Sequence, residues 1–77
     1  MKGKPTLLQL REKYGVATVP LARAARVAPD TVYFMLVGIP VEREEAEKVL
    51  QGFKKLTGVE YKLEEITVTL KSGITDT

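Results

Sequence analysis

The stretch Thr18–Gly38, TVPLARAARVAPDTVYFMLVG, decides the fold of this 77-residue chain. Its apolar residues recur at helical spacing in two runs, which predicts two short helices joined by a tight turn. Pro29 suits the first position of the second helix, because the N–H that proline lacks would be unpaired there in any case. Asp30 beside it suits the positive end of the helix dipole. Gly38 can take the left-handed conformation that ends a helix.

Several residues of this stretch recur at the same spacing in a known DNA-binding motif. They are a Leu-Ala pair in the first helix, an apolar turn residue, a Thr-Val pair in the second helix and a closing glycine: Leu21, Ala22, Val27, Thr31, Val32 and Gly38. In these positions the chain resembles the helix-turn-helix of the phage-repressor and Cro-like family, which includes bacterial regulators of the xenobiotic-response-element type. The resemblance implies an all-α, compact repressor-like domain of four to five helices. It also implies that residues 29–37 enter the major groove of double-stranded DNA.

Two positions depart from the family pattern. Arg26 stands where the family usually has glycine in the turn. A left-handed conformation costs a non-glycine residue about 1–2 kcal/mol, so the turn is either strained or differently shaped. Ala28 stands where a Ser or Thr usually caps the second helix, and the loss of that cap forgoes about 1 kcal/mol.

The resemblance implies a set of DNA-contacting residues. The base-facing candidates are Ala28, Pro29, Asp30, Thr31 and Phe34, with Tyr33 and Val37 nearby, and the phosphate-facing candidates are Thr18, Arg23, Arg26 and Arg43. Residues 28–37 contain no Arg, Lys, Asn or Gln, the side chains that pair bidentately with guanine or adenine. Specificity would therefore rest on shape, apolar contacts or residues outside this helix. Simple solvation of the arginines, and a helix-start role for Asp30, are the alternatives.

The second motif helix is apolar on nearly every side, which favours a rival function. If Val32, Met35 and Leu36 face the core, Tyr33, Phe34 and Val37 lie on or near the outside. A contiguous exposed apolar patch usually marks a protein interface. The alternative is thus a dimerisation or partner-binding module on the same scaffold. A third interpretation is that one of the two aromatic side chains folds back into the core.

Composition argues against catalysis. The chain has no histidine, no cysteine and only one serine, Ser72, so neither a Ser-His nor a Cys-His couple can form. We expect no enzyme activity, no metal, no cofactor and no small-molecule ligand. No apolar run approaches the roughly 18 residues of a membrane span, and no signal peptide is evident, so we expect a cytoplasmic protein without membrane contact.

Charge is unevenly distributed, although the net charge is only +2. Six basic residues and one acidic residue fall within residues 1–26, and the helix predicted after residue 41 is rich in Glu. This asymmetry suits a protein that presents one face to a polyanion. An ordinarily solvated surface is the alternative.

Two further helices flank the motif. Thr6 can cap a helix over Thr6–Tyr14, and a second helix is predicted over Glu42–Leu56, where Glu44 and Lys48 are spaced for an ion pair. The apolar stripe of that longer helix consists of Ala46, Val49, Leu50, Phe53 and Leu56. We expect one domain, residues 1–77, with the motif at 18–38.

The extension after Gly58, residues 59–77, changes character. Ile66–Leu70 alternates apolar and polar residues, is rich in β-branched side chains, and predicts a short C-terminal β-strand. A lone strand is not stable, so it must pair with Val59–Leu63, pair with its copy in a second subunit, or lie extended over the core. Because repressor operators are often two-fold symmetric, we expect a homodimer, with this strand as the candidate dimer contact.

Overall fold

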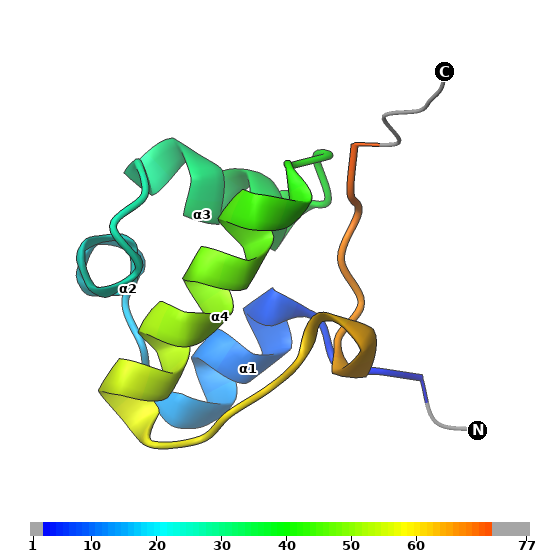
Figure 1. Ribbon diagram of the computed structural model, residues 1–77. Coiled ribbons are helices and arrows are strands. Elements are labelled where there is room, and N and C mark those ends of the chain that lie inside the picture. Colours follow the sequence, from blue (N-terminus) through cyan, green and yellow to red (C-terminus); the bar gives the residue numbers. More distant parts are fainter. Residues whose placement is uncertain (1–2, 72–77) are drawn as a thin grey trace.

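Four α-helices and one short 3-10 turn make up the computed structural model, which describes residues 3–71 (Figure 1). They are α1 (Leu7–Tyr14), α2 (Thr18–Ala25), α3 (Pro29–Val37), α4 (Arg43–Thr57) and the 3-10 turn η1 (Leu63–Glu65). The expectation of a compact, mostly helical chain is confirmed, and the predicted bounds of α1, α3 and α4 are correct to within one residue. Within residues 3–71, no helix combines the length and apolarity that crossing a membrane requires.

Local hydrogen bonds mark the start of α1 and the ends of the first three helices. At the start of α1, the Thr6 hydroxyl accepts from the Gln9 N–H at 3.1 Å, and the Gln9 side chain accepts from the Thr6 N–H at 3.0 Å. The first three helices each end at a left-handed residue, and the next N–H then donates five residues back. These pairs are Val16 to Arg11 after Gly15, Val27 to Ala22 after Arg26, and Ile39 to Phe34 after Gly38. Because the chain reverses so tightly, the loops between these helices are short.

The closest helix contact lies between α2 and α4. A Cβ atom added to Gly52 would lie 2.5 Å from the backbone nitrogen of Ala25 and 2.7 Å from its Cα. No side chain fits in that space, so the backbones of the two helices lie directly against each other. Glycine in a helix costs about 1 kcal/mol relative to alanine, and here close packing offsets that cost.

The core lies between α1, α2, α3 and α4 around Phe53, which is fully buried. The rings of Tyr14 and Tyr61 meet the Phe53 ring edge-on, at centroid distances of 5.4 and 6.1 Å. Ala46, Val49 and Leu50 of the predicted stripe are buried with it, whereas Leu56 is 45% exposed and lies outside the core.

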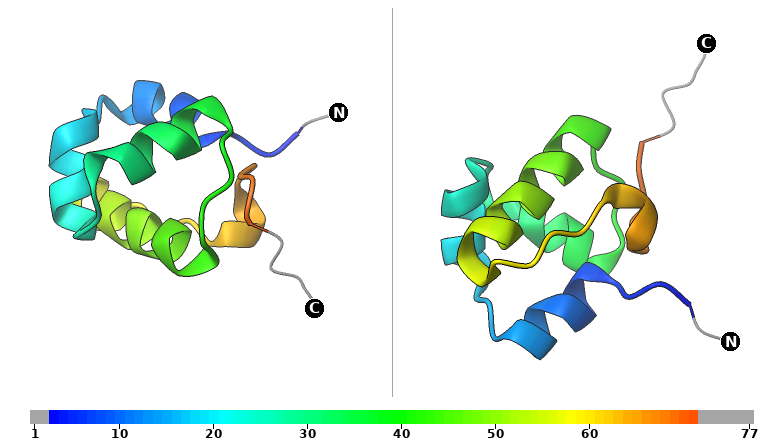
Figure 2. Two further views of the ribbon diagram at one scale, coloured as in Figure 1. Left: turned by 90° about the horizontal axis from the view of Figure 1, so that it is seen from above. Right: turned by 60° about the horizontal axis from the view of Figure 1, so that its bottom comes forward.

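The C-terminal segment corrects the sequence prediction, because Ile66–Leu70 forms no β-strand. Residues 66–71, called the strap from here on, run extended and make two isolated parallel bridges, Thr6 to Thr67 and Val41 to Leu70. The strap thus joins the chain before α1 to the loop between α3 and α4, at the opposite end of the molecule from α2 (Figures 1 and 2). Residues 72–77 of the expected extension, with Ser72, lie outside the described residues.

Backbone hydrogen bonds show why the strap does not serve as a free strand edge at these points. The Thr67 N–H donates to Pro5 at 2.8 Å, the Val41 N–H donates to Thr69 at 3.1 Å, and the Lys71 N–H donates to Val41 at 2.8 Å. Ile66 is buried at the start of the strap. Of the three arrangements considered for this segment, it adopts the one that lies extended over the core. The homodimer, and a contact made through this segment, stay predictions.

We predict that Gly52→Ala destabilises the protein despite the better helix propensity of alanine. Overpacking typically costs 1–3 kcal/mol and the propensity gain is about 1 kcal/mol, so we expect a net loss of about 1–2 kcal/mol. Urea unfolding of both proteins measures it. Gln51→Ala, an exposed neighbour on α4, is the matched control and should change stability by less than about 0.5 kcal/mol. A Gly52→Ala protein as stable as this control would contradict the packing described.

Candidate nucleic-acid interface

The pair α2 and α3 forms a helix-turn-helix around a three-residue turn, residues 26–28. Leu21 and Ala22 of α2 and Val32 of α3 are buried where the two helices meet the core. Arg26 has φ 61° and ψ 43°, so the turn keeps a left-handed residue although that residue is not glycine. Of the two alternatives raised by the sequence, the strained turn is the one observed, at a cost of about 1–2 kcal/mol.

The amino end of α3 is open to solvent. Ala28, Pro29 and Asp30 are exposed. Ala28 makes no side-chain cap hydrogen bond, because its methyl group has no acceptor atom. The exposed backbone N–H groups and the helix dipole leave a positive partial charge at this end, and Asp30 lies in the first turn beside it. These three residues form an exposed tip at the amino end of α3.

Further along α3, the candidate residues separate into inner and outer positions. Thr31 is buried, with only 7% of its surface exposed, so little of its side chain is open to a DNA base. Phe34 is half-buried and packs against the core, whereas Tyr33 is 55% exposed, with the two ring centroids 6.3 Å apart. The interpretation that one aromatic folds inward holds for Phe34. Val32, Met35 and Leu36 face or pack against the core as expected.

The candidate phosphate contacts on α2 lie beside this tip. Arg23 and Arg26 are exposed, and neither has a carboxylate within 4.0 Å among residues 3–71. Thr18 opens α2 and is half-buried. Two guanidinium groups without an ion-pair partner therefore precede α3: Arg23 in the last turn of α2 and Arg26 in the connecting turn.

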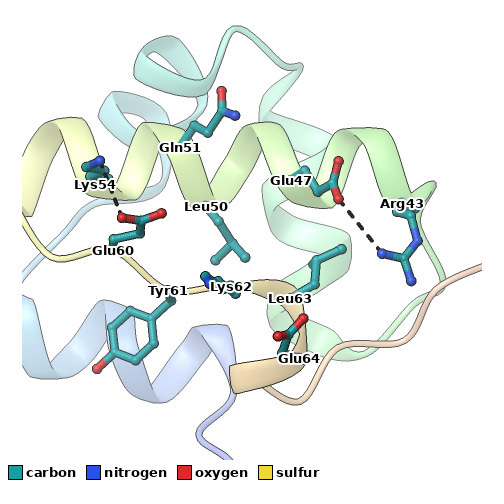
Figure 3. Close-up of a pocket in the computed structure, with 10 residues that line it drawn as sticks. All are labelled: Arg43, Glu47, Leu50, Gln51, Lys54, Glu60, Tyr61, Lys62, Leu63 and Glu64. Carbon is teal, nitrogen blue, oxygen red and sulfur yellow. Dashed lines mark hydrogen bonds and ion pairs between the residues drawn. The ribbon is translucent and has the colours of Figure 1, made fainter.

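Arg43 does not join them. It opens α4 and pairs with Glu47, with 3.8 Å between the guanidinium nitrogen and the carboxylate oxygen. It lines a hollow of about 550 Å³ between α4 and residues 60–64 (Figure 3). Gly52, which contacts α2, lies nine residues further along α4, about 13 Å by helix rise. The structure thus separates Arg43 from Arg23 and Arg26.

This hollow, called the balanced hollow, carries equal numbers of opposite charges. Its charged lining residues are Arg43, Lys54, Lys62, Glu47, Glu60 and Glu64, and the Lys54–Glu60 ion pair spans 3.5 Å (Figure 3). At one side, the hydrogen bond to the Tyr14 hydroxyl raises the pKa of Tyr61 above its usual value. Among residues 3–71, no three His, Cys, Asp or Glu side chains gather in a way that could hold a metal ion. The charged lining residues of the balanced hollow therefore sum to zero net charge, and four of the six form ion pairs with each other.

A second hollow, of about 320 Å³, was missed by the sequence prediction. We call it the cationic hollow; it lies between the end of α2 and α4 and is lined by Ala24, Ala25, Arg26, Lys48, Gln51 and Lys55. Lys48 was expected to pair with Glu44, but within the described part of the chain the ion pair on that part of α4 is Arg43–Glu47 instead. The signal present in the sequence is the spacing of Lys48 and Lys55 around Gly52, which has meaning only once α2 is known to pack there.

Comparisons with known proteins yielded nothing for this chain: no family model, curated protein or solved structure matches it.

We predict that Arg26→Gly stabilises the protein by about 0.5–1 kcal/mol. Glycine removes the strain of the left-handed conformation, which costs about 1–2 kcal/mol. It also gives the unfolded chain more conformational entropy, and this offsets part of the gain in stability. The matched control is Arg26→Ala, which removes the same charge but keeps a Cβ atom at φ 61°. Thermal unfolding of the three proteins separates the two effects. Equal stability of the Gly and Ala variants would show that the turn is not strained.

Proposed function

We propose that this protein is a DNA-binding transcriptional regulator of the repressor-like helix-turn-helix type, without enzyme activity, acting in the cytoplasm. The observation that supports it best is the exposed tip of α3, residues 28–30, flanked by the unpaired Arg23 and Arg26. In helix-turn-helix proteins the amino end of the second helix meets base edges while the first helix crosses the backbone. The placement of the exposed tip and the two arginines suits these two tasks.

The contacts available to α3 are few and mostly apolar. Asp30 can accept a hydrogen bond from the amino group of cytosine, and the exposed ring of Tyr33 can pack on a thymine methyl. Ala28 and Pro29 contribute shape but no base-reading hydrogen bond from their side chains. Affinity would then come chiefly from phosphate contacts by Arg23, Arg26 and Thr18, with modest discrimination between sequences.

Two copies bound to adjacent half-sites are part of the proposal. A single module of this size makes few contacts, and paired modules on a two-fold operator are the usual remedy. The strap does not supply that contact at Thr67 and Lys71, because their backbone N–H groups are used within the chain.

The test is an NMR titration of isotope-labelled protein with a mixed-sequence duplex at low salt. We expect amide shifts at Thr18, at residues 23–30 and at Tyr33, all of which fade as salt is added. The amides of α1 and of residues 60–65 serve as the internal control and should stay in place. Shifts confined to these control residues, or no shifts at all, would refute duplex binding by the helix-turn-helix.

A protein-interaction module is the second candidate, and one observation favours it. Tyr33, Val37 and Ile39 are 55%, 52% and 42% exposed along and just beyond α3, with the half-buried Phe34 beside Tyr33. Tyr33 and Val37 are four residues apart and so lie on one side of the helix. Exposed aromatic side chains backed by apolar neighbours are typical anchors of protein interfaces.

Tyr33→Ser separates the two candidates. If α3 enters DNA, we expect about fivefold weaker duplex binding, roughly 1 kcal/mol, and no change in sedimentation of the free protein. If α3 is a self-association surface, the same variant lowers the sedimenting mass at high concentration. Leu8→Ser on α1, also an exposed apolar residue, is the control and should change neither measurement.

A further inference from the structure

The cationic hollow gathers three positive charges without any acidic residue in its lining. Arg26 comes from the end of α2, and Lys48 and Lys55 come from α4. None of the three has a carboxylate within 4.0 Å among residues 3–71, whereas Arg43 and Lys54 on the same helix are both ion-paired. The excess of basic side chains without an ion-pair partner is therefore specific to the cationic hollow and does not hold for all of α4.

The negative ends of the nearby helix dipoles do not cancel this excess of positive charge. The carboxyl end of α2 borders the hollow, and Lys55 lies in the last turn of α4, so both negative helix ends are near. Each helix end carries only about half an elementary charge, so together they offset about one of the three positive charges. Among the lining residues themselves, about two positive charges stay uncompensated, which favours binding of an anion.

Two unusual backbone features create the arrangement. The missing side chain of Gly52 lets Ala25 lie against α4, which brings the next residue, Arg26, beside Lys48 and Lys55, located four residues before and three residues after Gly52. Arg26 itself occupies a left-handed conformation that glycine would take without strain. Strained residues persist where the surrounding structure or a function requires them. Here the strained residue is the one that supplies a charge to the hollow.

The position of the hollow relates it to the proposed DNA-binding surface. Pro29, at the exposed tip of α3, lies three positions after Arg26, so at most about 10 Å of chain joins them. An anion held here would lie beside whatever α3 contacts. Gln51, also in the lining, can add a neutral hydrogen-bond donor through its amide.

We propose that the cationic hollow binds a phosphate group of the DNA backbone next to the groove that α3 enters, an inference that rests on the proposed function. Arg26 offers a fork of donors to the phosphate oxygens, Lys48 and Lys55 supply charge from α4, and Gln51 donates between them. The contacts to DNA would then extend from α2 and α3 to the middle of α4. The first turn of α4, by contrast, is acidic.

The test compares the salt dependence of duplex binding for Lys48→Gln and Lys55→Gln with that of Lys54→Gln. Lys54 is the matched control, because it is adjacent on α4 and equally charged but faces the balanced hollow and pairs with Glu60. Each phosphate contact contributes about 0.9 to the slope of log K against log salt. We expect a flattening of about 0.9 for Lys48→Gln and for Lys55→Gln, and none for Lys54→Gln. All three residues are exposed, so the variants should fold, which thermal unfolding verifies.

The failures of the two proposals are distinguishable. If the wild-type chain binds the duplex and all three variants give the wild-type slope, or flatten it equally, the hollow is not a phosphate site while the proposed function stands. If the wild-type chain binds no duplex, the proposed function and the DNA source both fail. A titration with inorganic phosphate then decides the chemistry. Saturable shifts at residues 24–26 and 48–55 that Lys48→Gln abolishes would support a site for free phosphate, and no shifts would overturn the site.

Discussion

The structure depends first on the backbone contact between α2 and α4 at Gly52. An added Cβ atom there would lie 2.5 Å from the Ala25 nitrogen, so α2 occupies this position only because α4 presents no side chain. The contact fixes the position of the carboxyl end of α2, and with it the position at which the turn at residues 26–28 begins. At the other end of the molecule, the strap hydrogen-bonds to Val41 in the loop after α3 (Figures 1 and 2). The helix proposed to enter DNA is thus positioned from both of its ends.

Two neighbouring hollows along α4, both lined in part by Gln51, differ in their charge. The balanced hollow has an acid for each base, and Arg43–Glu47 and Lys54–Glu60 form ion pairs there. The cationic hollow has three bases and no acid in its lining. On the proposed function, the cationic hollow and the tip of α3 face the polyanion. Because α3 lacks bidentate base readers, backbone phosphates would carry most of the affinity.

Much of the fold could be predicted from the sequence, because local chemistry determines it. Thr6, Pro29 and Gly38 mark helix ends through their own backbone preferences, and the stripe Ala46–Phe53 reports its buried face through helical spacing. The prediction of a C-terminal strand was wrong, because alternating β-branched residues indicate an extended backbone but do not show whether a second strand pairs with it. In the structure, single residues of two loops pair with the strap and no second strand forms within residues 3–71.

The candidate site was less predictable, because it depends on which helices touch. The resemblance placed Arg23, Arg26 and the tip of α3 together, yet it could not show that Thr31 is buried or that Arg43 pairs away from them. The sequence could not predict that Lys48 and Lys55 belong to a site, because the pattern of one helix does not show that they lie near Arg26. Gly52, read alone, only weakens a helix. Its role appears when the backbone of α2 lies against it.

The most direct test of the central claim is the set of intermolecular NOEs between the labelled chain and an unlabelled duplex. We expect contacts from Ala28, Pro29 and the Tyr33 ring to major-groove protons, such as cytosine H5 and thymine methyls. In the same complex, we expect contacts from the Lys48 and Lys55 side chains to sugar protons beside one phosphate. NOEs that place the duplex against α1 or the strap, with α3 free, would contradict the account.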